Sequence, residues 1–266
     1  MGDVRVGIIT GSGTYALPGL EHPVPGTVQT RFGEVQVSSG RWRGAEVLHV
    51  SRHGEGHHRL SSQVNHRANV LALREAGAQV VLAVTVCGAV DPGLELGELV
   101  VFDDLHFLAN RLPDGSICTL HDEPGRAGRG HWVYERPFSE PLRRALLGGA
   151  GGAGLAARDG GCYGHVDGPR FNTRAEIRML GSCGVSAVSQ TAGPETVLCG
   201  EAELPYALLG YVTDYANGVK AQATTVEELT ELMGSSTAAL EAALGGALEL
   251  IGQDALEPTG TSIGWD

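Results

Sequence analysis

Residues 51–90 read SRHGEGHHRLSSQVNHRANVLALREAGAQVVLAVTVCGAV, and they decide the fold because they place a basic turn, a helix and a strand in succession. Residues 46–50 (EVLHV) have the pattern of a short strand, so Arg52 and His53 follow directly at a strand end. The mixed polar and apolar spacing over 63–76 predicts a helix. A guanidinium and an imidazole at a strand end indicate an anion site.

A second strand end lies further along the same stretch. Residues 80–84 (VVLAV) form a continuous apolar run, which suits a strand buried on both faces. We expect Thr85, Val86, Cys87 and Gly88 in a loop at its carboxyl end. Ligands of open α/β sheets bind at such ends, so the stretch outlines an anion and nucleoside site.

The composition excludes several classes of protein. A chain of 266 residues suits one α/β domain over 1–266, and no apolar stretch is long enough for a membrane helix. The net charge of −12 argues against nucleic acid as a partner, because a phosphate backbone requires a basic patch. The five cysteines include no CxxC pair, and residues 4–9 already follow a strand pattern without a secretory leader. We therefore expect a cytoplasmic protein without disulfides or structural zinc.

A glycine-rich turn follows the first predicted strand. Residues 10–14 (TGSGT) combine two glycines, which allow close approach of the backbone, with Ser12 and two threonines as hydroxyl donors. Such a turn can cradle a phosphate, and it can equally be a tight turn with no ligand. It is not a dinucleotide fingerprint, and the Walker lysine is missing.

The rest of the chain alternates strands and helices, which predicts a mostly buried sheet covered by helices. Further strands are expected near 97–102, 185–189 and 207–213. Further helices are expected over 195–203, between two prolines, and over 226–252, where the second helix serves only packing. Residues 103–163, including the glycine-alanine run 148–154, are expected to form an irregular loop.

Seven ordered motifs resemble the trimeric purine nucleoside phosphorylase and methylthioadenosine phosphorylase family. They are GIITGSGTY (7–15), SRHGEGHH (51–58), NHRANVLAL (65–73), TVCGAV (85–90), GHVDGPRFNTRAEIRML (164–180), SQTAGPETVL (189–198) and YVTDY (211–215). The resemblance implies an α/β fold with a mixed, barrel-like central sheet flanked by helices, and a homotrimer. It also implies cleavage of the N-glycosidic bond of a purine nucleoside by phosphate as co-substrate, without a further cofactor, to free purine and pentose 1-phosphate.

The resemblance assigns one set of residues to phosphate, in a reaction that builds positive charge on the ribosyl ring. These are Ser12, Arg52, His53, Thr85 and the backbone of Val86, with His53 also catalytic. The plainer alternative is a surface turn with a capping arginine. His53, His57 and His58 do not indicate a metal site, because glycines interrupt their spacing and no carboxylate pattern accompanies them.

A second set is assigned to the nucleoside. Phe171 would stack on the base, Cys87 and Gly88 would line its pocket, and Gln190 and Thr191 would lie near the sugar. Asp214 would be the catalytic acid at the purine N7 side, which requires a raised pKa. Two further assignments are Asp167, as an orienting acceptor or merely a turn residue, and His131, near the 5′ group of a neighbouring subunit's ligand.

The sequence departs from the family pattern in three places. Gln190 replaces the usual methionine under the ribose, Ala216 replaces a second aspartate of adenine-specific members, and Ala192 and Gly193 give a more open turn. Ala216 argues against strict adenine specificity, and the open turn would suit a larger or unusual substrate. Two alternatives are a catalytically weak nucleoside-binding or regulatory protein, which Gln190 would allow, and a nucleosidase that uses water, against which the retained phosphate residues argue.

Overall fold

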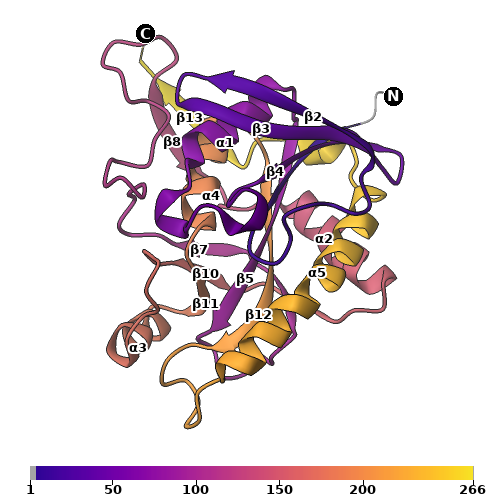
Figure 1. The fold of residues 1–266 in the computed structure, drawn as a ribbon. Helices are drawn as coiled ribbons and strands as arrows, with labels where there is room; N and C mark the ends of the chain where they lie inside the picture. The colour runs from indigo at the N-terminus through magenta and orange to yellow at the C-terminus, as the bar shows by residue number, and fades with distance from the viewer. Residues whose placement is uncertain (1–3, 266) are drawn as a thin grey trace.

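The computed structural model describes residues 4–265, which form a branched mixed sheet with helices on both faces (Figure 1). The strands are β1 (Arg5–Thr10), β2 (Glu21–Thr30), β3 (Gly33–Trp42), β4 (Ala45–Ser51), β5 (Val80–Ala89), β6 (Leu99–Val101), β7 (Asp104–His106), β8 (Gly130–Tyr134), β9 (Ala157–Asp159), β10 (Cys162–His165), β11 (Val185–Ser189), β12 (Tyr206–Tyr215) and β13 (Gly260–Gly264). The α-helices are α1 (His66–Glu75), α2 (Glu140–Gly152), α3 (Arg174–Ser182), α4 (Ala192–Glu201) and α5 (Val226–Leu248). Short 3₁₀ turns cover Glu55–His57, Ser61–Gln63 and Gln253–Leu256.

The main sheet has eleven strands and branches at β5. One edge of β5 pairs with β1 only as far as Ala83, and then with β11 only from Gly88 onward. The opposite edge pairs with β12 from Val81 to Ala89. The sheet therefore divides along β5, and among the described residues no strand pairs on that edge with the backbone between Ala83 and Gly88.

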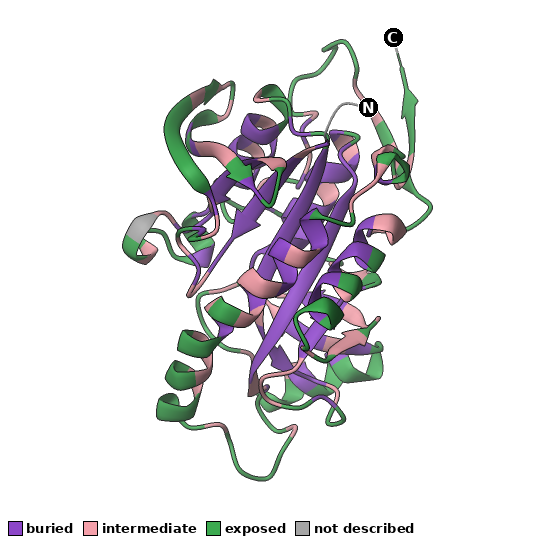
Figure 2. Cartoon of the chain, turned by 90° about the vertical axis from the view of Figure 1, so that its right-hand side faces the viewer, coloured by how far each residue is buried: buried purple, intermediate pink, exposed green. Residues whose placement is uncertain are grey.

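Both faces of the sheet are buried, as the apolar run in β5 predicts. Val81 and Ala83 point into one apolar cluster, which α1 and α4 cover, while Val80 and Leu82 point into a second, which α2 and α5 cover (Figure 1). The central strands accordingly lie inside the molecule (Figure 2). This is the arrangement expected of strands with alternating side chains between two helical layers.

The predicted carboxyl end of β5, at Val84, was wrong. The residues assigned to a loop after position 84 continue in β5 to Ala89, because β12 pairs with them along their whole length. The long antiparallel hairpin of β2 and β3 was not predicted, since β2 (EHPVPGTVQT) is mostly exposed and contains two prolines, which weaken a strand pattern.

The glycine-alanine run was also misread as a loop. Residues 148–152 belong to α2, which packs on α5. A Cβ at Gly149 would overlap with the backbone of Ala243 and Ala247, so the small residues allow the two helices to approach closely. The glycines of α2 therefore indicate close packing against α5 rather than a flexible loop.

The predicted helix over 195–203 begins earlier than expected, at Ala192. Pro194 lies within its first turn, where amide groups have no intrahelical partner and proline is tolerated. Helix α5 begins as predicted, because the Thr225 side chain accepts from the amide of Glu228 at 3.2 Å and the Glu228 carboxylate accepts from the amide of Thr225 at 2.8 Å. No helix within residues 4–265 is both long and apolar enough to span a membrane.

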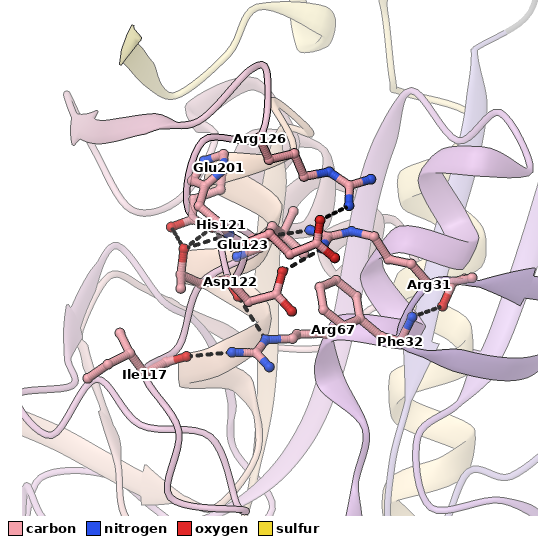
Figure 3. A network of polar contacts seen from close by, with 12 residues as sticks. Arg31, Phe32, Arg67, Ile117, His121, Asp122, Glu123, Arg126 and Glu201 are labelled. Carbon is pink, nitrogen blue, oxygen red and sulfur yellow. Dashed lines mark hydrogen bonds and ion pairs between the residues drawn. The ribbon is translucent and has the colours of Figure 1, made fainter. Parts of the chain in front are cut away.

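Side chains from three elements fix the irregular segment 117–126 (Figure 3). Arg67 of α1 donates to the carbonyls of Ile117 and Thr119 at 2.9 and 2.8 Å. Glu201 of α4 accepts from Thr119 and from the amide of Leu120, and Arg31 at the β2–β3 turn donates to the Leu120 carbonyl. Side chains here satisfy backbone groups that a strand or helix would otherwise pair.

Candidate functional site

A cavity of about 290 Å³ opens where the sheet divides along β5. Its walls come from the ends of β1, β4, β11 and β12, residues 85–88 of β5, the loop after β10 and helix α5. The predicted residues that line it are Ser12, Arg52, His53, Thr85, Val86, Cys87, Gly88, Phe171, Gln190, Thr191 and Asp214. Strand ends thus meet at one place, as the α/β pattern predicts.

Arg52 lies at the polar end of this cavity and is almost completely buried, at 1% exposure. Its Nε and Nη2 donate to the two carboxylate oxygens of Glu195 at 2.6 and 2.8 Å, and its Nη1 donates to the carbonyl of Val84 at 2.8 Å. Burial raises the pKa of Glu195, but the Arg52 charge outweighs it and holds that pKa below its usual range. The two groups form a buried, ionised pair.

This pair changes the expected role of Arg52. A guanidinium commonly holds a dianion with two parallel hydrogen bonds, yet Glu195 occupies that face of Arg52. What Arg52 still presents is its Nη1 edge, beside the glycine turn, where a Cβ at Gly11 would overlap with that nitrogen. Sequence reasoning missed Glu195, although an acid in the middle of the otherwise apolar stretch AGPETVLCG (192–200) is a signal for a buried partner.

His53 lies beside Arg52 and is held in one orientation. Its Nδ1 lies 2.8 Å from the carbonyl of Arg59, and because a carbonyl only accepts, Nδ1 carries the proton and Nε2 is an acceptor. Burial, reinforced by the Arg52 charge, lowers the pKa of His53 to about 4, so the ring is neutral at pH 7. The Nε2 of a neutral imidazole can accept a hydrogen bond from a hydroxyl or from a protonated anion oxygen.

His57 adds a second imidazole that the sequence reading did not place in the site. Its ring stacks on that of His53 with centroids 4.2 Å apart, and its Nδ1 lies 3.1 Å from the hydroxyl of Tyr15. His57 has a positive φ of 58°, a strained conformation for a residue with a side chain. The contact between His57 and Tyr15 connects the turn after β4 with the turn after β1.

The hydroxyl groups at the polar end come from β5, β11 and the turn after β1. The Thr85 hydroxyl lies 3.1 Å from that of Ser189, and Ser12 lies in the glycine-rich turn after β1. Thr237 of α5 donates to the carbonyl of Gly13 at 2.8 Å and so fixes this turn. The polar end therefore collects hydroxyls, an imidazole and the stretch of β5 between its pairings with β1 and β11, which together can bind a partly protonated anion.

Asp214 lies at the other end, where a β-bulge places it. Val212 pairs with Cys87 and Asp214 pairs with Gly88, so Thr213 is an extra residue in β12 that redirects the next side chain. The Thr213 hydroxyl donates to Asp214 Oδ1 at 3.0 Å, and Gly88 makes room, since a Cβ there would lie 2.8 Å from Oδ2. Burial raises the pKa of Asp214, and the hydrogen bond from Thr213 opposes this only in part.

Apolar residues complete the wall around Asp214. Ile177 of α3, Val188 of β11 and Ala216 belong to a small separate apolar cluster that borders the cavity. Leu229 and Met233 of α5 also line it, so that helix does more than the packing expected of it. An aromatic base would find an apolar slot with one carboxyl group at its edge.

Two predicted residues lie outside this cavity. Asp167 is exposed and does not line it, which fits the alternative of a turn residue before Gly168. His131 is on the separate β8–β13 ribbon, opposite Ile263, and its exposed ring contacts that of Trp265 at 5.0 Å between centroids. The part of the chain that the structure describes also contains no cluster of three or more metal-ligating side chains.

Comparison with known proteins identifies the family of this chain. A family model described as "Phosphorylase superfamily" matches residues 5–249. The chain belongs to this superfamily. The predicted family and the predicted α/β fold class are therefore confirmed.

Individual relatives cover nearly the whole chain. A probable 6-oxopurine nucleoside phosphorylase of Thermococcus kodakarensis is 36% identical over 251 residues, or 93% of this chain and 92% of its own. A probable S-methyl-5′-thioinosine phosphorylase of Pseudomonas syringae pv. tomato is 33% identical over 89% of this chain and 95% of its own. A solved methylthioadenosine phosphorylase from Schistosoma mansoni, in complex with adenine, superposes with a TM-score of 0.84 at 28% identity, covering 93% and 91% of the two chains.

Proposed function

We propose that this superfamily member is a pentosyltransferase that cleaves the N-glycosidic bond of a 6-oxopurine nucleoside with phosphate, giving free purine and pentose 1-phosphate. The observation that carries the proposal is one cavity with hydroxyls and an imidazole at one end and the Asp214 carboxyl group at the opposite end. Thr85 and Gly88 mark the two ends and are three residues apart on β5, which corresponds to about 10 Å. A nucleoside with phosphate on the far face of its sugar fits such a length.

Phosphate would occupy the polar end. Cleavage builds positive charge on the ribosyl ring, and an anion held against that ring stabilises the charge while supplying the new bond to carbon. Ser12, Thr85, the Arg52 Nη1 edge and the Val86 backbone would hold the anion, and His53 Nε2 would accept from its protonated oxygen. Because Glu195 neutralises Arg52, the site relies on these donors rather than on net positive charge.

The purine would occupy the apolar slot with its N7 toward Asp214. A raised pKa keeps this carboxyl protonated nearer to neutral pH, so that it can donate to N7 as negative charge grows on the leaving base. Among the described residues, Asp214 is the single carboxylic acid lining the cavity, and Ala216 offers no acceptor for an exocyclic amine. The names of the Thermococcus and Pseudomonas relatives support the same 6-oxo preference.

A substrate panel tests this function. The purified protein is incubated with inosine, guanosine, methylthioinosine, adenosine and methylthioadenosine, with and without phosphate, and free purine is followed by chromatography. We expect phosphate-dependent release from the 6-oxopurine nucleosides, with kcat/KM at least about tenfold above that for the 6-amino compounds, because an unpaired exocyclic group costs at least one hydrogen bond. Equal release without phosphate would identify a nucleosidase, and binding without release would identify the regulatory alternative.

We further propose a cytoplasmic homotrimer. Exposed apolar side chains on and directly after the β8–β13 ribbon support a subunit contact, namely Val133 at 49%, Ile263 at 50% and Trp265 at 54% exposure. His131 lies among them, which supports its expected position near a neighbouring subunit's ligand. Light scattering should give three times the mass of the 27.7 kDa chain, and Ile263→Asp should lower that mass, whereas a monomeric parent protein would refute the contact.

A further inference from the structure

Gln190, the residue directly after β11, has an amide group bonded at both ends to the protein. Its Oε1 accepts from the Ser61 hydroxyl at 2.8 Å, and its Nε2 donates to the carbonyl of Arg170 at 3.2 Å. Ser61 belongs to the turn before α1, and Arg170 to the loop between β10 and α3. Segments more than 100 residues apart in the sequence therefore meet at one side chain.

Both of these segments form the wall of the cavity. Leu60 and Ser61 line it from one side, and Pro169 and Phe171 line it from the other. The loop lies directly against the amide, because a Cβ at Gly168 would overlap with both Gln190 Oε1 and Ser61 Oγ. The position of Phe171 thus depends on a backbone that Gln190 holds at the preceding residue.

The loop has other hydrogen bonds, but they hold it mainly to α3 and to the loop after β12. Arg170 pairs with Glu176 of α3 at 2.7 Å, and Asn217 donates to the carbonyl of Asn172 at 2.7 Å. Phe171 itself is 61% exposed, so little packing fixes it. Among the side-chain bonds of the described residues, the bond to the Arg170 carbonyl is the one that ties this loop to the end of β11.

We propose that Gln190 is a positioning residue that clamps the Ser61 turn and the Arg170 loop together and so holds Phe171 over the nucleoside. This inference rests on the proposed function for the identity of the ligand. The clamp would set nucleoside affinity, since the loop is ordered before the ligand arrives and less entropy is lost on binding. Phosphate affinity would not depend on it, because neither bonded segment supplies the anion donors named above.

The test compares Gln190→Met, which keeps the length of the side chain and removes both hydrogen bonds, with Gln36→Met on the exposed strand β3 as control. We expect Gln190→Met to raise KM for inosine about tenfold, as the loss of two hydrogen bonds predicts, with KM for phosphate unchanged. Ser61→Ala should give a smaller rise, and the double variant should be no worse than Gln190→Met alone. Equal changes in both KM values, or none in either, would overturn the proposal.

A second readout does not depend on turnover. Trypsin should cleave after Arg170 several-fold faster in Gln190→Met than in the parent protein, as identified by mass spectrometry, while Gln36→Met behaves as the parent. An unchanged cleavage rate would refute the clamp even if the enzyme is active. A faster rate in a protein without phosphorolysis would support the clamp and refute only the proposed function.

Discussion

Replacement of Asp214 by alanine should lower kcat for inosine by about 10²–10⁴-fold, because the departing purine then has no acid to neutralise it. Phosphate binding should change little, since the anion donors lie at the other end of the cavity. Steady-state kinetics at saturating phosphate measure the loss. The matched control is Asp167→Ala, which removes an exposed carboxylate outside the cavity and should leave kcat near that of the parent.

The dependence of kcat on pH shows whether Asp214 donates a proton to the purine or only contacts it. Because the pKa of Asp214 is raised, the carboxyl is protonated below that raised value, and kcat should fall as pH rises through it. Asp214→Asn keeps a hydrogen-bond donor but cannot titrate, so its profile should lack this alkaline limb. An unchanged limb in Asp214→Asn would assign it to another group and remove Asp214 as the acid.

Replacement of Glu195 by alanine should lower the free energy of unfolding by about 3–5 kcal/mol, because it leaves the buried charge of Arg52 uncompensated. Urea denaturation, followed by circular dichroism, measures this change. Arg52→Met should also be destabilising, because the buried Glu195 carboxylate then loses two charge-assisted hydrogen bonds and retains the one that the Tyr206 hydroxyl donates at 3.2 Å. The double replacement with Glu195→Leu should recover much of the loss, since no unpaired charge remains.

An exposed ion pair provides the control for this prediction. Arg43 and Glu249 lie 2.9 Å apart with half of each side chain exposed, so Glu249→Ala should change stability little. If Glu195→Ala were as mild as Glu249→Ala, the buried pair would not contribute to stability as the structure indicates.

The sequence predicted the strands and helices whose patterns are local. The apolar run in β5, the caps of α5 and the strand at 185–189 all follow from neighbouring residues. The continuation of β5 through Thr85 does not, because it depends on pairing with β12, more than 100 residues away. The glycines of α2 indicate a loop by propensity, but the contact with α5 requires small residues there.

In the candidate site too, local features were predicted from the sequence and long-range contacts were not. Motifs located Arg52, His53 and Asp214 because each stands at a strand end. They did not reveal that Glu195 occupies the bidentate face of Arg52, that a bulge at Thr213 directs Asp214, or that Gln190 binds two loops. Those features arise from contacts between distant segments, which a single sequence read along its length does not display.

The most direct test of the account is ³¹P nuclear magnetic resonance of the parent protein with inosine and phosphate. We predict that a pentose 1-phosphate resonance grows in step with free hypoxanthine, and that its rate falls with Asp214→Ala and not with Asp167→Ala. Hypoxanthine released with free ribose and no phosphate ester would contradict the account, because water and not the proposed anion would then be the nucleophile.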